Sequence, residues 1–234
     1  MEDLFKEKLK ALRAASLDRR LREISSSQGP EIEIGGRRLV NFSSNDYLVF
    51  ANDSRLRKAA IAAINEFGLG AGASRLISGT QSPHVRLERA LAKWIEWLLN
   101  RARSFVYSTA PPPAVAAAAL AAVNFLSSSE GEKRRLLLWE KIYLMRKFLL
   151  ALSGKRSTLN SNSGSAIFPW TVGHEQAALN LASALQREGF LVPAIRYPTV
   201  AKGAARLRIT VTALHQEDQI HSLCEAIKRN SAAA

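Results

Sequence analysis

The chain has 234 residues, of which 47% are hydrophobic and 23% charged, the composition of a globular protein large enough to bury a core. Its single cysteine, Cys224, excludes an internal disulfide and a cysteine-based metal site, and is typical of a reducing compartment. The formal charge of +13 invites a nucleic-acid interpretation, but the sequence has no zinc spacing, helix-turn-helix pattern or basic–aromatic platform. Solvated helix faces or an anionic substrate explain the charge more simply, so we expect no nucleic acid.

The N-terminus predicts a helix followed by a hairpin. Phe5, Leu9 and Leu12 recur on one face of a helix that we expect to run to about Glu23, and it is too charged for a signal peptide. The alternating residues of 31–42, with two glycines between them, predict two antiparallel strands.

A second helix is expected after the hairpin, with a glycine-rich loop behind it. Asp53 or Ser54 is suited to cap its start, and Gly68 to end it. Its apolar stripe consists of Leu56, Ala60, Ile64 and Phe67.

The middle of the chain reads as mainly helical. Helical spacing continues from Pro83 to Phe105 with no glycine or proline between, which predicts one long helix. An alanine-rich helix and an amphipathic helix over about 132–152 follow, and 153–165 reads as a linker. No apolar run reaches the ~20 residues of a membrane span, so we expect no membrane insertion and a cytoplasmic protein.

The last 70 or so residues predict a compact α/β unit with one helical layer on an antiparallel or mixed sheet. Its expected elements are a strand over 166–172, a helix over 175–187, strands over 190–195 and 206–211, and a helix over 217–229. Cys224 falls on the apolar stripe of the last helix, which predicts a buried and inert thiol.

Two motifs do not carry the chemistry that they suggest at first sight. The G-x-G-x-G in residues 68–74 follows a helix rather than a strand, so it is not a dinucleotide fingerprint. The histidines show no metal spacing and are expected to be surface or capping residues: His84, His174, His215 and His221.

Arg206 and Arg208 alternate by two on a predicted strand, so both point to one face. Two guanidinium groups on one face are suited to bind a substrate carboxylate. A pair of exposed strand arginines explains the pattern equally well, and both interpretations stay open.

Four long strings resemble a known family. They are NFSSNDYL, GLGAGASRLISGTQSPHVRLERALAKW, NRARSFVYSTAPPPAVAAAALAAV and FLVPAIRYPTVAKGAARLRITVTALH. In this order they resemble the 8-amino-7-oxononanoate synthase family, the biotin-pathway branch of the α-oxoamine synthases. The resemblance covers about residues 4–229. It implies an α/β fold of the fold type I pyridoxal-phosphate transferases, in a homodimer.

The resemblance also implies the reaction and the site. The family transfers an acyl group from a pimeloyl thioester to L-alanine with decarboxylation, using pyridoxal 5'-phosphate. Matching positions for substrate binding are Arg19, Asn45, Thr199 and Arg208, and those near the cofactor phosphate of a neighbouring subunit are Ser108 and Thr109. Two smaller departures are Val49, where the family usually has glycine, and Asp18, where it commonly has an aromatic residue.

One larger departure concerns the junction of Trp94 and Ile95. In the family a large central domain stands there, with the lysine that forms the Schiff base, and this sequence runs directly through. Lys155 lies in a different context and does not replace that lysine. We therefore expect an incomplete fold, no catalytic residue, and an inactive acyltransferase chain. The alternative is a non-catalytic remnant or a subunit that associates with a complete homologue.

The missing block also predicts how the rest is organised. We expect an N-terminal segment over 1–94, a helical connection over 95–165 and a C-terminal small domain over 166–230. The small domain should be the most native-like part. The N-terminal hairpin should lack the partner on which it lies, and the apolar helix face of 115–123 should be exposed or repacked.

Overall fold

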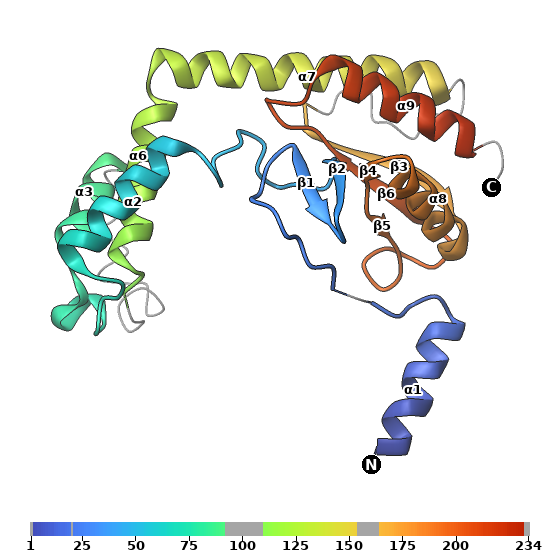
Figure 1. Ribbon diagram of the computed structural model, residues 1–234, viewed down its shortest axis with the longest axis horizontal. Coiled ribbons are helices and arrows are strands. Elements are labelled where there is room, and N and C mark those ends of the chain that lie inside the picture. The colour runs from blue at the N-terminus through green and yellow to red at the C-terminus, as the bar shows by residue number, and fades with distance from the viewer. Residues whose placement is uncertain (1, 20, 92–109, 154–163, 232–234) are drawn as a thin grey trace. The chain divides into compact units, whose positions relative to one another are not determined.

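The computed structural model describes residues 2–19, 21–91, 110–153 and 164–231 (Figure 1). These residues form two compact units. The sheet unit contains the described residues of Met1–Val49 and Leu136–Ala234, and the helical unit contains those of Phe50–Arg135. The predicted domain boundaries fall in or beside stretches outside the described residues and stay predictions.

The sheet unit contains two three-stranded sheets, with strand orders β1-β2-β4 and β3-β6-β5. Its elements are α1 (Glu2–Ala14), β1 (Glu31–Ile34), β2 (Arg37–Asn41), most of α7 (Ser129–Ser153), β3 (Ile167–Gly173), α8 (Glu175–Arg187), β4 (Phe190–Leu191), β5 (Ala194–Ile195), β6 (Ala205–Thr210) and α9 (Glu217–Ser231).

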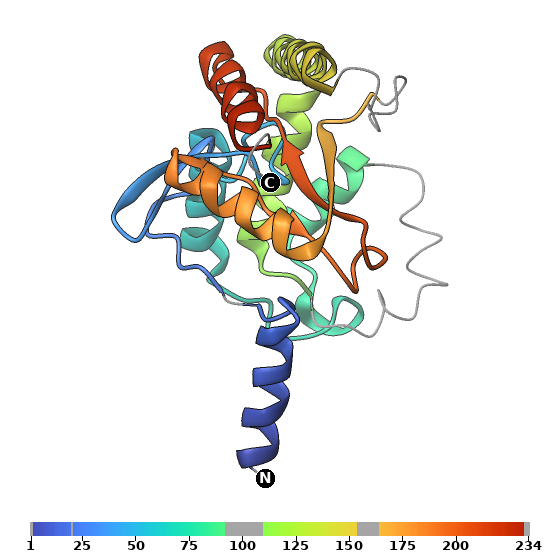
Figure 2. The same cartoon turned by 90° about the vertical axis from the view of Figure 1, so that its right-hand side faces the viewer.

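Strand β6 is the centre of the second sheet, antiparallel to β3 on one side and β5 on the other. Leu207 and Ile209 on β6 are fully buried, together with side chains of α8, α9 and α7. Helices α7 and α9 lie side by side in both views (Figure 2), and the Cys224 Sγ of α9 lies 3.9 Å from the Met145 Sδ of α7. The C-terminal α/β elements are thus present, and of the two predicted alternatives, an antiparallel or a mixed sheet, the β3-β6-β5 sheet is antiparallel. They share one compact unit with the described residues of Met1–Val49.

The thiol of Cys224 is also as expected. Its side chain is buried, and burial raises the pKa of Cys224 to about 12. At neutral pH it is therefore protonated and unreactive.

The strand predicted over 190–195 is instead two short strands in different sheets. Pro193 lies between them and has no backbone N–H with which to continue a ladder. As a result, β4 pairs with β2 and β5 pairs with β6.

The expectation that the hairpin lacks a partner is wrong. Strand β2 pairs in parallel with β4, with Val40 opposite Phe190 and Asn41 opposite Leu191. The Phe42 N–H donates to the Leu191 carbonyl at 3.1 Å, and the Phe42 carbonyl accepts from the Thr210 N–H at 2.8 Å. Phe42 is fully buried in the same core as β6. The C-terminal strands supply the cover that the sequence analysis assigned to another domain.

Helix α1 ends at Ala14, well before the predicted Glu23. Ser16 has a left-handed backbone with φ 55, and the N–H groups of Ser16 and Leu17 donate back to the carbonyls of Arg13 and Leu12. This is the paired 5→2 and 6→1 pattern that closes a helix C-terminus. Serine is an uncommon residue for the left-handed position, which is why the sequence did not indicate the stop.

The helical unit has the helices that the sequence predicts. They are α2 (Ser54–Phe67), α3 (Ser82–Leu91), α6 (Pro113–Leu126) and the start of α7, with one π-helical turn, η1 (Arg75–Gly79). Asp53 caps α2 by accepting from the Arg55 N–H at 2.9 Å, and Gly68 ends it with φ 78.

The face of 115–123 was expected to be exposed or repacked, and it is exposed only at Val115. Ala116 is buried and the rest are half-buried, because α2 and α3 pack on α6. The helix predicted to continue from Pro83 to Phe105 is described as far as Leu91, and the remainder, with the junction at Trp94, lies outside the described residues.

No single helix of the described ranges is long and apolar enough to cross a membrane. The pair α6 and α7 meets the length and composition criterion only together, and it is bent by 79° at the break.

Candidate carboxylate-binding site

Arg208 on β6 forms the centre of the candidate site. Its neighbours Leu207 and Ile209 point into the core, so the alternation of the strand turns the Arg208 side chain to the opposite face. There the Arg208 Nη2 donates to Asn45 Oδ1 at 2.7 Å. Asn45 and Arg208 are far apart in sequence, and the fold brings these two predicted residues together.

The loop that carries Asn45 is fixed by hydrogen bonds on both sides. The buried Asn41 Oδ1 accepts from the Ser43 N–H at 3.1 Å and from Ser43 Oγ at 2.6 Å. The Tyr47 carbonyl accepts from the Ala213 N–H at 2.8 Å, which ties the loop to the residues after β6. The Asn45 amide is therefore held in place beside the guanidinium before any ligand binds.

Arg208 is half-buried and, among the described residues, has no carboxylate partner. Its bond to Asn45 engages one of five guanidinium donors. A half-buried cation with an amide as its side-chain partner is suited to bind an incoming carboxylate in bidentate fashion.

Arg206 does not join this arrangement. Its Nε donates at 3.1 Å to the carbonyl of Ala204, the residue directly before β6. The two strand arginines thus have different partners, and the joint fork that their spacing suggested does not form.

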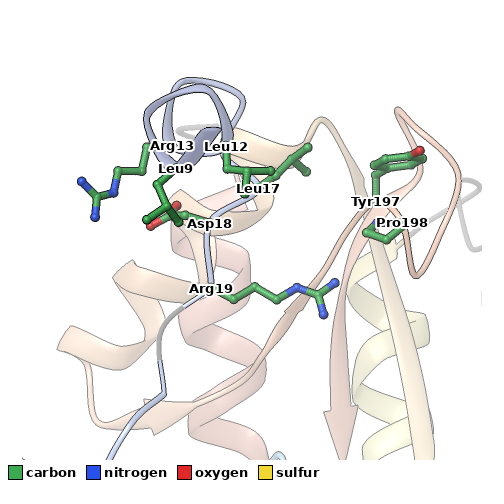
Figure 3. A pocket seen from close by; sticks show the side chains of 8 residues that line it. All are labelled: Leu9, Leu12, Arg13, Leu17, Asp18, Arg19, Tyr197 and Pro198. Carbon is green, nitrogen blue, oxygen red and sulfur yellow. The ribbon is translucent and has the colours of Figure 1, made fainter. Parts of the chain in front are cut away.

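A pocket of about 600 Å³ lies between the end of α1 and the β5–β6 loop (Figure 3). Leu9, Leu12 and Leu17 line one side, Tyr197 and Pro198 line the other, and Arg19 points its guanidinium toward that second side. Arg196 holds the two sides together, because its guanidinium donates to the carbonyls of Ser16 and Asp18.

The predicted site residues therefore fall into four groups. Asn45 and Arg208 are in contact, and Arg19 lines the pocket. Thr199 is exposed on the β5–β6 loop, where its N–H donates to the Arg196 carbonyl at 3.0 Å. Ser108 and Thr109 lie outside the described residues.

Sequence reasoning missed Arg196. Its importance comes from two carbonyls near the other end of the chain, and its sequence neighbours contain no signal for that contact. The proline two residues later, after a cis Tyr197–Pro198 bond, marks only a turn.

The histidines serve structural roles where they are buried. His84 Nδ1 accepts from the Gln81 N–H at 3.1 Å at the start of α3, and His215 Nδ1 accepts from the Thr212 N–H at 2.9 Å. His215 also stacks on Phe42, with ring centroids 4.3 Å apart. Among the described residues no group of three side chains is arranged to hold a metal ion.

Comparison with known proteins decides the family. The aminotransferase class I and II family matches residues 94–227, more than half of the chain. The chain belongs to this family. The match confirms the predicted class of pyridoxal-phosphate-dependent enzymes.

Curated relatives of this aminotransferase-family chain are named 8-amino-7-oxononanoate synthase, the family that the sequence resembles. An 8-amino-7-oxononanoate synthase 2 of Polaromonas sp. (strain JS666 / ATCC BAA-500) is 45% identical over 136 residues, which are 57% of this chain and 34% of the relative. An 8-amino-7-oxononanoate synthase of Anaeromyxobacter sp. (strain Fw109-5) is 52% identical over 90 residues, 38% of this chain and 23% of the relative. The chain spans about a third or less of the length of these relatives.

Solved structures share the fold. A serine palmitoyltransferase of Sphingomonas wittichii superposes with a TM-score of 0.84 at 15% identity, covering 99% of this chain and 97% of that chain. A variant of the S. paucimobilis enzyme gives 0.83 at 15% identity, with the same coverage. The fold type I α/β architecture that the resemblance implied is thereby confirmed.

The described residues do not fit the cofactor of this family. A Schiff-base lysine must lie in a pocket that shields it from water. Every lysine among the described residues is exposed or half-buried, and the best covered of them, Lys141, pairs with Glu140 at 3.3 Å. Lys93 and Lys155 lie outside the described residues. The described lysines therefore do not supply a Schiff-base site for pyridoxal phosphate.

Proposed function

We propose that this chain is the substrate-carboxylate-binding frame of an 8-amino-7-oxononanoate synthase-type acyltransferase and does not complete the reaction by itself. The reaction would join a pimeloyl thioester to L-alanine with loss of carbon dioxide. The observation that carries the proposal is the Arg208–Asn45 contact, in which a strand guanidinium with no carboxylate partner among the described residues lies beside a fixed loop. What this chain would lack is the central segment that the family has at the Trp94–Ile95 junction, with the lysine that forms the Schiff base.

Arg208 would bind the L-alanine carboxylate, and Asn45 would hold the guanidinium in the orientation that receives it. A charge-assisted hydrogen bond stabilises a complex by about 1.5–3 kcal/mol, so removing the arginine should abolish measurable binding of so small a ligand. Arg19 and the apolar wall of the pocket beside it would contact the thioester substrate.

The binding half of the proposal is tested by saturation-transfer NMR with L-alanine. We expect a signal with the unmodified chain and none with Arg208→Gln. Arg206→Gln on the same strand is the matched control and should keep the signal, because Arg206 is engaged with the Ala204 carbonyl. If Arg208→Gln binds L-alanine as well as the unmodified chain does, the assignment of Arg208 is wrong.

The catalytic half is tested by borohydride reduction in the presence of pyridoxal phosphate, followed by peptide mapping. We expect scattered substoichiometric labelling of surface lysines. Stoichiometric labelling of one lysine would show that a Schiff-base site exists and that the chain is not catalytically incomplete.

The second candidate is a non-catalytic subunit of a complete homologue. The intact sheet unit, with its own buried core, favours it, because a stable fold is a prerequisite for such a role. Co-expression with a full-length 8-amino-7-oxononanoate synthase, followed by affinity purification through a tag on this chain, tests for the complex.

A further inference from the structure

The pocket between α1 and the β5–β6 loop, which we call the α1 pocket, has two sides that meet at one residue, Arg196. The Arg196 guanidinium donates to the carbonyls of Ser16 and Asp18, just after α1. The Arg196 carbonyl accepts from the Thr199 N–H at 3.0 Å and from the Val200 N–H at 3.4 Å. The side chain of Arg196 therefore ties down one side of the pocket, and its backbone closes the turn that carries the other side.

The segment that carries Arg19 gains little from the hydrophobic core. The side chains from Phe5 to Arg19 are all exposed or half-buried, and none belongs to the buried clusters of the sheet unit. Polar contacts therefore have to fix this segment. Besides Arg196, Gln176 reaches it, since Gln176 Oε1 accepts from Ser16 Oγ. The Arg196 fork holds two peptide groups at once, because the donors of a guanidinium are fixed in one plane.

One of the two carbonyls that Arg196 holds belongs to the peptide group that leads into Arg19. The Asp18 carbonyl lies in one plane with the nitrogen and Cα of Arg19, so a hydrogen bond to it fixes the plane from which the Arg19 side chain leaves. The Arg19 guanidinium points toward Tyr197 and Pro198 (Figure 3). Arg19 is exposed, and within the described ranges its side chain has no hydrogen bond or ion pair that holds it in this direction. The backbone therefore determines where its charge lies.

We propose that Arg196 is a positioning residue of the α1 pocket, which acts through Arg19 and does not contact the ligand. By holding the Asp18–Arg19 peptide group, it directs the Arg19 guanidinium across the apolar walls of the pocket. There the charge is available to a carboxylate on a ligand with an apolar body. This inference deepens the proposed function and rests on it for the choice of ligand, the acyl part of the thioester substrate.

The order of Arg19 without any ligand tests the positioning directly. The heteronuclear NOE of the Arg19 amide and of its Nε–H group reports motion on the picosecond-to-nanosecond timescale. We expect both groups to be rigid in the unmodified chain and mobile in Arg196→Gln. Arg196→Lys keeps the charge but not the planar fork, so Arg19 should show intermediate motion. Arg187→Gln, at the exposed end of α8, removes one positive charge as the matched control and should leave Arg19 rigid.

A double-mutant cycle with pimelate, the free diacid of the proposed acyl group, separates positioning from direct contact. The affinity is read from the shift of the Tyr197 amide signal as pimelate is added. We expect Arg19→Gln and Arg196→Gln each to weaken binding by about tenfold. The double variant should bind no more weakly than Arg19→Gln alone, because Arg196 then has no charge left to position. Losses that add up would show that Arg196 acts on the ligand without Arg19, and would overturn the proposal.

The two measurements also distinguish this inference from the proposed function. A mobile Arg19 in Arg196→Gln, together with no binding of pimelate by the unmodified chain, would confirm the positioning role and contradict the α1 pocket as the substrate site. An Arg19 that stays rigid in both Arg196 variants would overturn the positioning role, whatever the pocket binds. If Arg196→Gln does not fold, as judged by circular dichroism, Arg196→Lys alone decides between these outcomes.

Discussion

Val49 adopts a backbone conformation that its side chain disfavours. Its φ is 58, in the left-handed region, and it is one of two non-glycine residues with positive φ among the described residues. The resemblance indicated glycine at this position from sequence alone, and the conformation supplies the physical reason. A β-branched side chain crowds the backbone there, whereas glycine does not.

Val49→Gly should therefore stabilise the protein by about 1 kcal/mol, the relief of strain exceeding the added flexibility of the unfolded chain. Urea denaturation followed by circular dichroism measures the change. Val40→Gly, in a β strand with a negative φ, is the control and should destabilise. A destabilised Val49→Gly would show that the valine side chain contributes more by packing than it costs in strain.

His215 makes the stability depend on pH. Burial lowers the pKa of His215 to about 4, against a smaller raising effect of the Asn41 backbone. In the unfolded chain a histidine titrates near 6.5. Between these values the unfolded chain binds a proton that the folded chain does not, so stability falls as the pH falls from about 6.5 to 4.

The free energy of unfolding should fall by on the order of 3 kcal/mol as the pH falls across that window. His215→Asn keeps an acceptor near the Thr212 N–H but does not titrate, so its stability should fall less over the same window. Urea midpoints at pH 7, 6, 5 and 4 for both proteins measure the difference. Parallel curves would mean that carboxylates elsewhere cause the whole dependence.

At the scale of elements, the sequence predicted best where the signal is local. Asp53 and Gly68 mark both ends of α2, and the predicted bounds of α8 agree with the structure, because caps and apolar spacing lie within the element itself. The predictions failed where distant strands decide. The split of 190–195 and the cover on β2 both follow from the pairing of β2 with β4, which no short window of sequence contains.

That pairing reverses an expectation for hydrogen exchange. A hairpin without a partner would exchange quickly, but the N–H groups of Val40 and Phe42 donate to the Gly189 and Leu191 carbonyls. We expect these two amides to be protected within about tenfold of those in β6.

Helix α1 provides the contrast in the same experiment. Its apolar residues Phe5, Leu9 and Leu12 are exposed, so its amides should exchange orders of magnitude faster than those of β6. Slow exchange in α1, or fast exchange at Val40 and Phe42, would show that the local stabilities of these elements follow a different order in solution. Native-state exchange read by NMR resolves the individual amides.

At the scale of the whole molecule, the candidate site shows the same division. Asn45 and Arg208 could be assigned from motifs because each lies in a family-like string, and the fold brings them into contact. Arg196 could not, since its role depends on carbonyls at Ser16 and Asp18 that any residue would supply. The sequence identifies each side chain, but every residue has a backbone carbonyl, and only the fold determines which carbonyls accept a hydrogen bond from a given side chain.

The parallel pairing of β2 with β4 also determines how the chain tolerates changes in its contour length. These strands meet only after all the residues between Asn41 and Phe190 have been drawn into a closed loop. The entropy lost in closing such a loop rises with the logarithm of its length, about 0.6 kcal/mol for each doubling. An insertion between Trp94 and Ile95 that made this loop several times longer would therefore weaken the β2–β4 pairing only slightly. The sheet unit is compatible with a short or a long connection at that point.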